Sequence, residues 1–494
     1  MNDLHALVNG LAHPKILVIG DLILDRYTWG NAERISPEAP VMVFHADREE
    51  VRLGGAASVA GLLRALEADV TLAGVTGDDH AGRVLTTLLR AQSIRHEAVL
   101  CDPGRPTTSK TRYMGRAGNR HPQQILRVDR EERRALDPDI ERQLISAILD
   151  QVDSHAAVLI SDYAKGVCTP ALMGQVIDRA RRHGIPVLID PARITDYAKY
   201  RGATLLAPNR VETEMATGTR IQIPGDARLP ASMLAEKLNI ATVLIKLDSE
   251  GMFLYQAGQE GRLYATRPRG VYDVTGAGDM VLAMMGLCQA SKLSWEEAVP
   301  LANLAAGLEV EKLGVAPVTR AEIHVELARS TGTFAPKLVT LKEMLLLAEA
   351  YRGVRKTLVF TNGCFDLLHV GHASYLQEAA KLGDILVVAV NSDSSVRRLK
   401  GMNRPVIGEA DRAGMVAALG CVHHVLLFED DTPLELLRQL RPEVLVKGGT
   451  YAPEQVVGKE EVESYGGKVC VTRVIEGIST TDILAVARKP LQGN

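Results

Sequence analysis

The chain has 494 residues, of which 46% are hydrophobic and 24% are charged, as expected for a globular protein. Its net charge of −3 does not favour a nucleic acid or an anionic membrane as a partner. No apolar run approaches the roughly 18 residues of a membrane-spanning helix, and the first residues lack the pattern of a secretory signal. Six separated cysteines without a CxxC pair indicate reduced thiols, so we expect a cytoplasmic protein.

Short aliphatic and β-branched runs alternate with helical stretches through residues 1–330. Each run ends in or near Gly, Asp or Asn: KILVIGD, VTLAGVTGD, AAVLISDYAKG, IPVLIDPA, ATLLAPN and ATVLIKLDSEG. Runs that are apolar throughout are typical of strands buried on both faces of a mainly parallel sheet, with functional loops at their carboxyl ends. The sequence therefore predicts an α/β domain over residues 1–330.

A second α/β domain is expected over residues 341–494, after a linker at 331–340. Thr340 and Glu343 have the spacing of a capping box, which predicts the start of a helix at LKEMLLLAEAYRG. A second series of strand-like runs follows: TLVFTNG, DILVVAVNSD, HHVLLFED, PEVLVKGG and GKVCVTRV. The second domain is about half the size of the first.

The stretch VYDVTGAGDMVLAMMGLC carries the strongest chemical signal of the first domain. Gly276, Ala277 and Gly278 have little or no side chain, so their amides can approach an anion at the start of the predicted helix. An aspartate at position 279 suits a general base that takes the proton of an acceptor hydroxyl. The local pattern also fits a glycine-rich turn in which Asp279 only caps the helix.

Four motifs in chain order resemble the ribokinase-like (PfkB) carbohydrate kinases: GDLILD, RLGGAASVA, APNRVE and DVTGAGD, the last with Val274 in place of threonine. The resemblance covers about residues 10–325 and implies a mainly parallel sheet with a lid. It implies phosphoryl transfer from ATP to a sugar hydroxyl, with Asp279 as the base, Mg²⁺ arriving with ATP, and no metal site of the protein's own. It implies sugar contacts at Asp21, Gly54 and Gly55, and ATP contacts at Asn209, Arg210, Val211, Glu212, Gly276, Ala277 and Gly278.

Basic residues between positions 110 and 127 could hold a phosphate that is already on the sugar. They are Lys110, Arg112, Arg116, Arg120 and Arg127. The stretch SDYAKG, which contains Lys165, resembles a segment near the site in the sugar-phosphate branch of the kinase family. A solvated basic face and a strand-end turn explain these residues equally well from sequence alone.

Two histidines, His369 and His372, follow the strand-like TLVF in the stretch TNGCFDLLHVGH. A zinc site is disfavoured, since the spacing is not HExxH and no cysteine pair lies near. Core packing gives no reason for Gly371, whereas a tight turn into a helix does. Both imidazoles then project from one side of the first turn, which predicts a polyphosphate site.

The HVGH stretch resembles the HxGH motif of the cytidylyltransferase-like nucleotidyltransferases, over about residues 357–490. The resemblance implies a Rossmann-like domain in which His369 and His372 stabilise charge as pyrophosphate leaves the α-phosphorus of a nucleoside triphosphate. It implies further ATP contacts at Thr361, Asn362, Gly371, Lys400, Lys447, Ser479, Thr480 and Thr481.

The order of the two modules resembles the bifunctional enzymes that make ADP-heptose for the lipopolysaccharide core. This resemblance implies that ATP and heptose phosphates are the substrates, and that the protein is a homodimer. The first step is phosphorylation of D-glycero-β-D-manno-heptose 7-phosphate at O1, and the second is transfer of AMP to heptose 1-phosphate. A CTP-dependent enzyme for another sugar or polyol phosphate is an alternative. A non-catalytic sugar-nucleotide sensor is another, disfavoured by the intact Asp279, His369 and His372.

Overall fold

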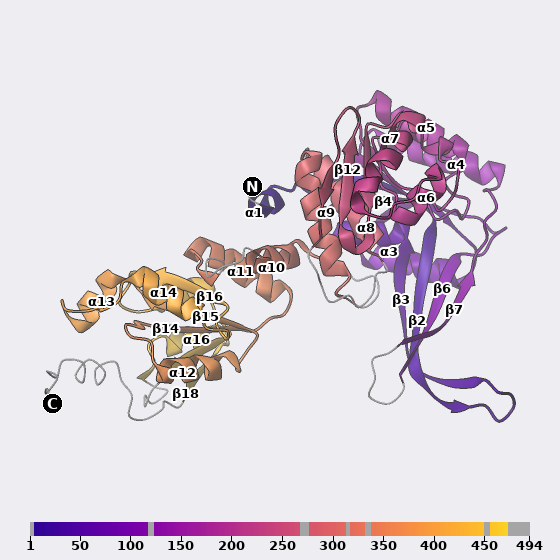
Figure 1. Cartoon of the computed structure of the whole chain (residues 1–494). Coiled ribbons are helices and arrows are strands. Elements are labelled where there is room, and N and C mark those ends of the chain that lie inside the picture. The colour runs from indigo at the N-terminus through magenta and orange to yellow at the C-terminus, as the bar shows by residue number, and fades with distance from the viewer. Residues whose placement is uncertain are drawn as a thin grey trace. The chain divides into compact units, whose positions relative to one another are not determined.

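The computed structural model describes residues 4–116, 123–266, 276–312, 317–330, 337–448 and 455–472 (Figure 1). The chain forms two compact units, Met1–Arg320 and Ala321–Asn494, so helix α10 (Arg320–Ser330) falls almost wholly in the second unit. The expected linker at 331–340 stays a prediction, because residues 331–336 lie outside the described residues. No helix in the described ranges is long and apolar enough to cross a membrane.

A nine-stranded sheet forms the centre of the first unit, in the order β13-β12-β11-β10-β9-β8-β1-β4-β5. The strands from β11 to β5 are parallel, whereas β12 and β13 are antiparallel additions at one edge. Their bounds are β1 (Lys15–Gly20), β4 (Asp69–Thr76), β5 (Arg95–Cys101), β8 (Ala157–Ser161), β9 (Val187–Asp190), β10 (Leu205–Leu206), β11 (Thr242–Lys246), β12 (Met252–Gln256) and β13 (Arg262–Tyr264). The mainly parallel sheet predicted from the apolar runs is confirmed.

Helices cover both faces of this sheet, as the continuous burial of successive side chains along central strands such as β8 and β4 requires. Val158 and Ile160 of β8 belong to the core formed with α4 and α5, whereas Leu159 meets α8 on the other face, where Gly286 leaves room for it. The helices of the unit are α1 (Leu4–Asn9), α2 (Ala56–Ala65), α3 (His80–Ala91), α4 (Pro138–Val152), α5 (Pro170–Arg182), α6 (Arg210–Thr217), α7 (Arg228–Leu238), α8 (Ala277–Ala290) and α9 (Trp295–Glu309), with short 3₁₀ turns at η1 (Ala198–Tyr200), η2 (Pro224–Ala227) and η3 (Asp248–Glu250).

A separate four-stranded sheet forms the expected lid, which extends as an arm from the larger sheet in Figure 1. Its order is β3-β2-β6-β7, with β2 (Leu22–Ile35), β3 (Met42–Gly55), β6 (Thr108–Arg116) and β7 (Gln123–Arg130). Strand β2 begins one residue after Asp21, at the carboxyl end of β1. The base of the lid therefore lies where parallel α/β sheets place their ligands.

The second unit contains a five-stranded parallel sheet in the order β16-β15-β14-β17-β18, which is the Rossmann order. Its strands are β14 (Leu358–Gly363), β15 (Ile385–Asn391), β16 (His424–Phe428), β17 (Val444–Gly448) and β18 (Lys468–Thr472). Its further helices are α11 (Leu341–Gly353), α12 (Val370–Ala380), α13 (Asp393–Lys400), α14 (Glu409–Ala417), α15 (Leu434–Leu440) and α16 (Lys459–Ser464). The predicted capping box is confirmed: Thr340 Oγ1 accepts from the Glu343 amide, and the Glu343 carboxylate accepts from the Thr340 amide.

Candidate active sites

Asp279 lies in the first turn of α8, a helix that begins directly after Gly276, whose φ of 104° only glycine adopts readily. The Asp279 side chain is buried, and its Oδ1 accepts a hydrogen bond of 3.0 Å from the Tyr163 hydroxyl. Burial, followed by the charge of Asp190, raises the pKa of Asp279 to about 7. A carboxyl that titrates near neutral pH is suited to general-base catalysis.

An ion pair between Lys246 and Asp190 lies beside this helix start. The two residues end the parallel strands β11 and β9, and Lys246 Nζ lies 2.6 Å from Asp190 Oδ1. A Cβ added to Gly278 would lie 3.3 Å from Lys246 Nζ and 3.5 Å from Asp190 Oδ2, so the glycine leaves room for the pair. Burial would lower the pKa of Lys246, but Asp190 and Glu212 raise it overall. The ammonium therefore stays charged.

The predicted nucleotide residues 209–212 separate into two pairs in the structure. Asn209 and Glu212 form a capping box at the start of α6, and Asn209 lies next to the end of β11 through an isolated bridge. Burial, followed by Asp190, raises the pKa of Glu212 to about 7. In contrast, Arg210 pairs with Asp248 at 3.3 Å, and Val211 is 45% exposed. The structure thus brings Asn209 and Glu212 to the site but ties the Arg210 guanidinium to a carboxylate.

Asp21 holds the loop after β8 rather than an open pocket. Its Oδ2 accepts from the backbone amides of Tyr163 at 2.8 Å and Lys165 at 3.0 Å, and its Oδ1 accepts from Val167 at 3.2 Å. Burial and the neighbouring Asp162 raise the pKa of Asp21, while the three amides oppose the rise. A sugar contact at Asp21 stays a prediction, and the structure adds a positioning role.

Gly54 and Gly55 end β3 at the base of the lid. A Cβ at Gly54 would lie 2.3 Å from Asp25 Oδ2, and Asp25 Oδ1 in turn binds Arg112 at 2.5 Å. Gly55 has a φ of 59°, and a Cβ there would lie 2.4 Å from the Asp21 carbonyl oxygen. Both glycines are therefore needed for the close approach of β3 to the Asp25 carboxylate and to the backbone at Asp21.

Lys165, in the loop after β8, and the basic residues of the lid are used in different ways. Lys165 pairs with Glu131 at 2.5 Å, and Arg127 pairs with Asp129 at 2.9 Å on the outer strand. Lys110 Nζ lies 5.0 Å from the centroid of the Tyr163 ring. Arg120 and the side chain of Arg116 lie outside the described part of the chain.

His369 and His372 meet at the start of α12, with ring centroids 3.9 Å apart. Both Nδ1 atoms are buried without a hydrogen-bond partner among the described residues. Burial, then His369 and Lys400, lowers the pKa of His372 to about 4. Lys400 is exposed at the end of α13, and Gly371 is buried inside the first turn of α12. The two imidazoles therefore form a polar pair with unsatisfied ring nitrogens, near the Lys400 ammonium.

Lys447 and Asn362 connect the ends of the adjacent strands β17 and β14. Lys447 Nζ donates to Asn362 Oδ1 at 2.7 Å and to the Asn362 carbonyl oxygen at 3.2 Å. Burial lowers the pKa of Lys447 to about 8. Thr361 is fully buried, and its hydroxyl forms a hydrogen bond with the Tyr375 hydroxyl. This contact supports the end of β14. Ser479, Thr480 and Thr481 lie outside the described residues.

Sequence motifs did not indicate Asp190, Lys246 or Arg412, and SDYAKG was noted for Lys165 rather than for Tyr163. Tyr163, Asp190 and Lys246 stand at or just after strand ends, which was the one signal available for Asp190 and Lys246. Arg412 is fully buried, and it donates to the Cys364 carbonyl oxygen at 2.5 Å, so it holds the loop that precedes the histidine pair. Among the described residues, no group of three or more His, Cys, Asp or Glu side chains could hold a metal ion.

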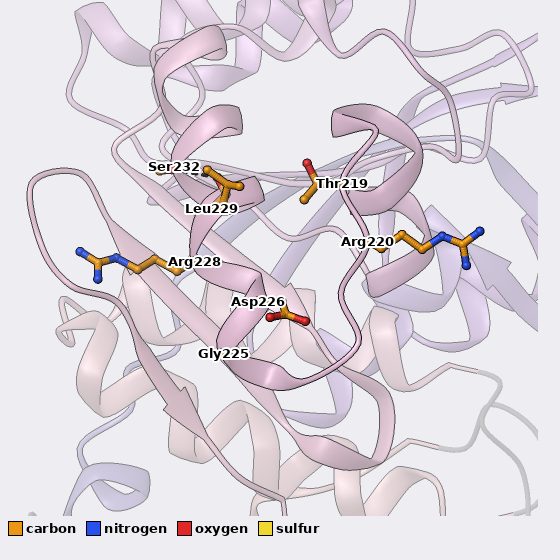
Figure 2. Close-up of a pocket in the computed structure, with 7 residues that line it drawn as sticks. All are labelled: Thr219, Arg220, Gly225, Asp226, Arg228, Leu229 and Ser232. Atoms are coloured by element: carbon orange, nitrogen blue, oxygen red, sulfur yellow. Dashed lines mark hydrogen bonds between the residues drawn. The ribbon is translucent and has the colours of Figure 1, made fainter.

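A cavity of 390 Å³ lies between α6 and α7, away from the carboxylates described above (Figure 2). Figure 2 shows Arg220 and Arg228 pointing away from one another, with Asp226 between them. The Asp226 carboxylate accepts from the amides of Gln222 and Ile223, so it closes a turn. The two cations do not converge, and the cavity has no feature of an anion site.

Two family models match the chain: the pfkB family carbohydrate kinases over residues 13–321 and the cytidylyltransferase-like family over residues 360–486. The bifunctional protein HldE of Syntrophotalea carbinolica is 46% identical over 95% of this chain and 95% of its own length. That of Geobacter sulfurreducens is 46% identical over 95% and 94%.

Solved structures share the fold of the first unit. Arabidopsis thaliana ribokinase complexed with ribose and ATP covers 64% of this chain and 99% of its own, with a TM-score of 0.51 and 20% identity. Escherichia coli phosphofructokinase-2 in complex with substrates and products covers 65% and 100%, with a TM-score of 0.54 and 20% identity. At this identity the likeness shows the fold alone.

The chain is therefore a bifunctional enzyme, a PfkB carbohydrate kinase joined to a cytidylyltransferase-like nucleotidyltransferase. In particular, it belongs to the HldE family of bifunctional proteins, which it matches over nearly its whole length.

Proposed function

We propose that the protein catalyses two steps of ADP-heptose biosynthesis for the lipopolysaccharide core. The first unit phosphorylates D-glycero-β-D-manno-heptose 7-phosphate at O1 with ATP. The second unit transfers AMP from ATP to heptose 1-phosphate and releases pyrophosphate. The full-length match to HldE proteins supports this pair of reactions, and the buried Asp279 with its pKa of about 7 is the observation that carries the kinase half.

In the kinase step, the Asp279 carboxylate takes the proton of the O1 hydroxyl as O1 attacks the γ-phosphorus and ADP leaves. Amides at Gly276, Ala277 and Gly278 and the helix start stabilise the charge that develops on the transferring group. The Lys246 ammonium, held 2.6 Å from Asp190, adds positive charge at the same place.

Asp190 and Glu212 fit a Mg²⁺ ion that arrives with ATP. Mg²⁺ is typically bound by one or two carboxylates together with substrate phosphates, rather than by a complete protein cage. The raised pKa of Glu212, caused by burial and by Asp190, indicates a surplus of negative charge that a divalent cation would neutralise. When bound, the ion supplies charge stabilisation for the transferring phosphoryl group.

In the transferase step, a phosphate oxygen of heptose 1-phosphate attacks the α-phosphorus of ATP and pyrophosphate leaves. His369 and His372 donate hydrogen bonds to phosphate oxygens, which satisfies polar groups that lack partners in the described residues. Lys400 and Lys447 supply positive charge, and the family resemblance implies further phosphate contacts from Ser479, Thr480 and Thr481, which lie outside the described residues. No covalent enzyme intermediate is needed.

One protein with two variants tests both assignments. Asp279→Asn should lower heptose-dependent ADP formation by about 10²–10⁴, the usual contribution of a general base, and leave pyrophosphate release from heptose 1-phosphate unchanged. His372→Ala should lower pyrophosphate release by about 10²–10³ and leave ADP formation unchanged. CTP in place of ATP is the control for the second reaction. An equal loss of both activities in a folded Asp279→Asn protein would refute two independent sites.

The proposal includes a cytoplasmic homodimer that forms through the lid. Ile125, Leu126 and Val128 on the edge strand β7 are 40%, 53% and 47% exposed, and an uncovered edge strand with exposed apolar side chains is a pairing surface. Light scattering should give twice the chain mass for the wild type and a monomer for Leu126→Glu. The control is Leu229→Glu, since Leu229 is 59% exposed on α7. A dimer in both variants would exclude the lid as the interface.

A further inference from the structure

Lys110 is a partly buried ammonium at the base of the lid. It lies on β6, opposite Asp25 of β2 and Asp129 of β7 in the strand register. Its Nζ lies 5.0 Å from the Tyr163 ring centroid, and it forms no hydrogen bond or ion pair with another described residue. Burial lowers the pKa of Lys110, Asp25 opposes the shift, and Arg112 adds to it.

The carboxylates near Lys110 already bind other cations. Asp25 binds Arg112 at 2.5 Å, and both side chains are buried. Asp129 binds Arg127, and Glu131 binds Lys165. Lys110 therefore carries a positive charge that no carboxylate of the described residues neutralises through contact. A buried charge without a counterion is costly, so this position favours an anionic ligand.

Tyr163 connects this position to the catalytic base. Lys110 lies over the ring of Tyr163, and the hydroxyl of the same side chain donates to Asp279 Oδ1 at 3.0 Å. Asp21 fixes the backbone of the loop by accepting from the amides of Tyr163 and Lys165. Lys110 and Asp279 thus contact the same tyrosine side chain, Lys110 over its ring and Asp279 at its hydroxyl.

We propose that Lys110 forms a subsite for the phosphate that the sugar already carries. Tyr163 sets the separation between this subsite and Asp279, so the hydroxyl at the other end of the sugar reaches the base. The ligand class is a sugar phosphomonoester. This inference rests on the proposed kinase reaction and assigns the part of the site that distinguishes a sugar phosphate from a free sugar.

The test is Lys110→Met, which keeps an unbranched side chain one atom shorter and removes its charge. With heptose 7-phosphate, kcat/KM for ADP formation should fall about 10- to 100-fold, the effect expected for a lost hydrogen bond to a charged group, mainly through KM. With unphosphorylated heptose, kcat/KM should not change. The control is Lys15→Met, because Lys15 is exposed at the opposite end of β1. The melting temperature of Lys110→Met should equal or exceed that of the wild type, since a buried unpaired charge is removed.

Calorimetric binding of heptose 7-phosphate without ATP separates the possible failures. Weaker binding by Lys110→Met supports the subsite. Equal binding and equal KM in both proteins would overturn the subsite while the kinase reaction stands. An equal loss of kcat with phosphorylated and free heptose would place Lys110 at the reacting end and also overturn it. If the wild type neither binds nor phosphorylates heptose 7-phosphate, both the proposed substrate and the subsite fail.

Discussion

Asp279 is the proposed general base, but its surroundings disfavour the ionised carboxylate that a base must provide. A carboxyl that is buried beside Asp190 resists ionisation, and its hydrogen bond from Tyr163 only partly offsets this. The carboxyl therefore has a pKa close to neutral pH, which suits a general base. Ionising the buried carboxyl lowers the stability of the folded state.

The kinase rate should therefore depend on pH through Asp279. With a pKa of about 7, the carboxylate fraction and the value of kcat/KM fall by about tenfold per unit below neutral pH. Pyrophosphate release by the second unit should not share this acid limb. Parallel pH profiles of the two reactions in one preparation provide the measurement. A kinase profile that is flat between pH 5 and pH 8 would contradict the assignment.

The thermal stability of Asp279→Asn should also depend on pH. The folded pKa of about 7 lies above the ordinary value of 3.8, so ionisation of Asp279 destabilises the folded state increasingly as the pH rises between these values. Asparagine cannot ionise, so the variant should melt at a higher temperature than the wild type above pH 7. This gain should disappear below about pH 4. Scanning calorimetry at pH 4 and pH 8 compares the two, and a pH-independent difference would refute it.

Residues within short motifs could be proposed from the sequence, whereas residues that meet only in the fold could not. The glycines before Asp279 and the HVGH spacing are local patterns with a local physical reason. Tyr163, Asp190 and Lys246 are single residues far apart in the chain, brought together because parallel strands end at one edge of the sheet. The commitment of Asp21 to three backbone amides likewise follows from the loop conformation, which no local pattern predicts.

At the scale of elements, buried strands were predictable and exposed ones were not. Runs such as AVLIS become β8, fully buried between helices. The lid strand β7, QQILRVDR, is exposed along its length and carries polar residues throughout, so its sequence lacks the apolar run that marks the central strands. The lid was therefore expected from the family resemblance alone.

The start of α8 should be intolerant of added volume. Gly278→Ala places a Cβ 3.3 Å from Lys246 Nζ, which forces the ion pair with Asp190 to shift. A displacement of this kind should lower the kinase kcat by up to about 10²-fold with little loss of stability, because Gly278 does not have a left-handed conformation. The matched control is Gly174→Ala in α5, where a new Cβ meets nothing within 4 Å. Equal kinase rates for the two variants would contradict the role of the pair.

At the scale of the whole molecule, each unit has its own sheet and its own hydrophobic core. Residues 1–330 and 338–494, expressed separately, should therefore each fold and retain one activity. Because Ala321 packs against the core of the second unit, a piece that begins at 321 should melt at a higher temperature than one that begins at 338. Circular dichroism melts and the two product assays test this. Insoluble pieces from a soluble whole chain would refute the division.

The separation of the two sites has a genetic consequence. A cell with two copies of the gene, one encoding Asp279→Asn and the other His372→Ala, contains one working kinase and one working transferase on different chains. Intermediates that diffuse between chains should then restore core lipopolysaccharide, although neither allele alone does so. If the two alleles together do not restore core lipopolysaccharide, with both proteins present at normal amounts, the intermediate must stay with one chain. If the two alleles together do restore it, mutations in a single open reading frame will fall into two complementation groups.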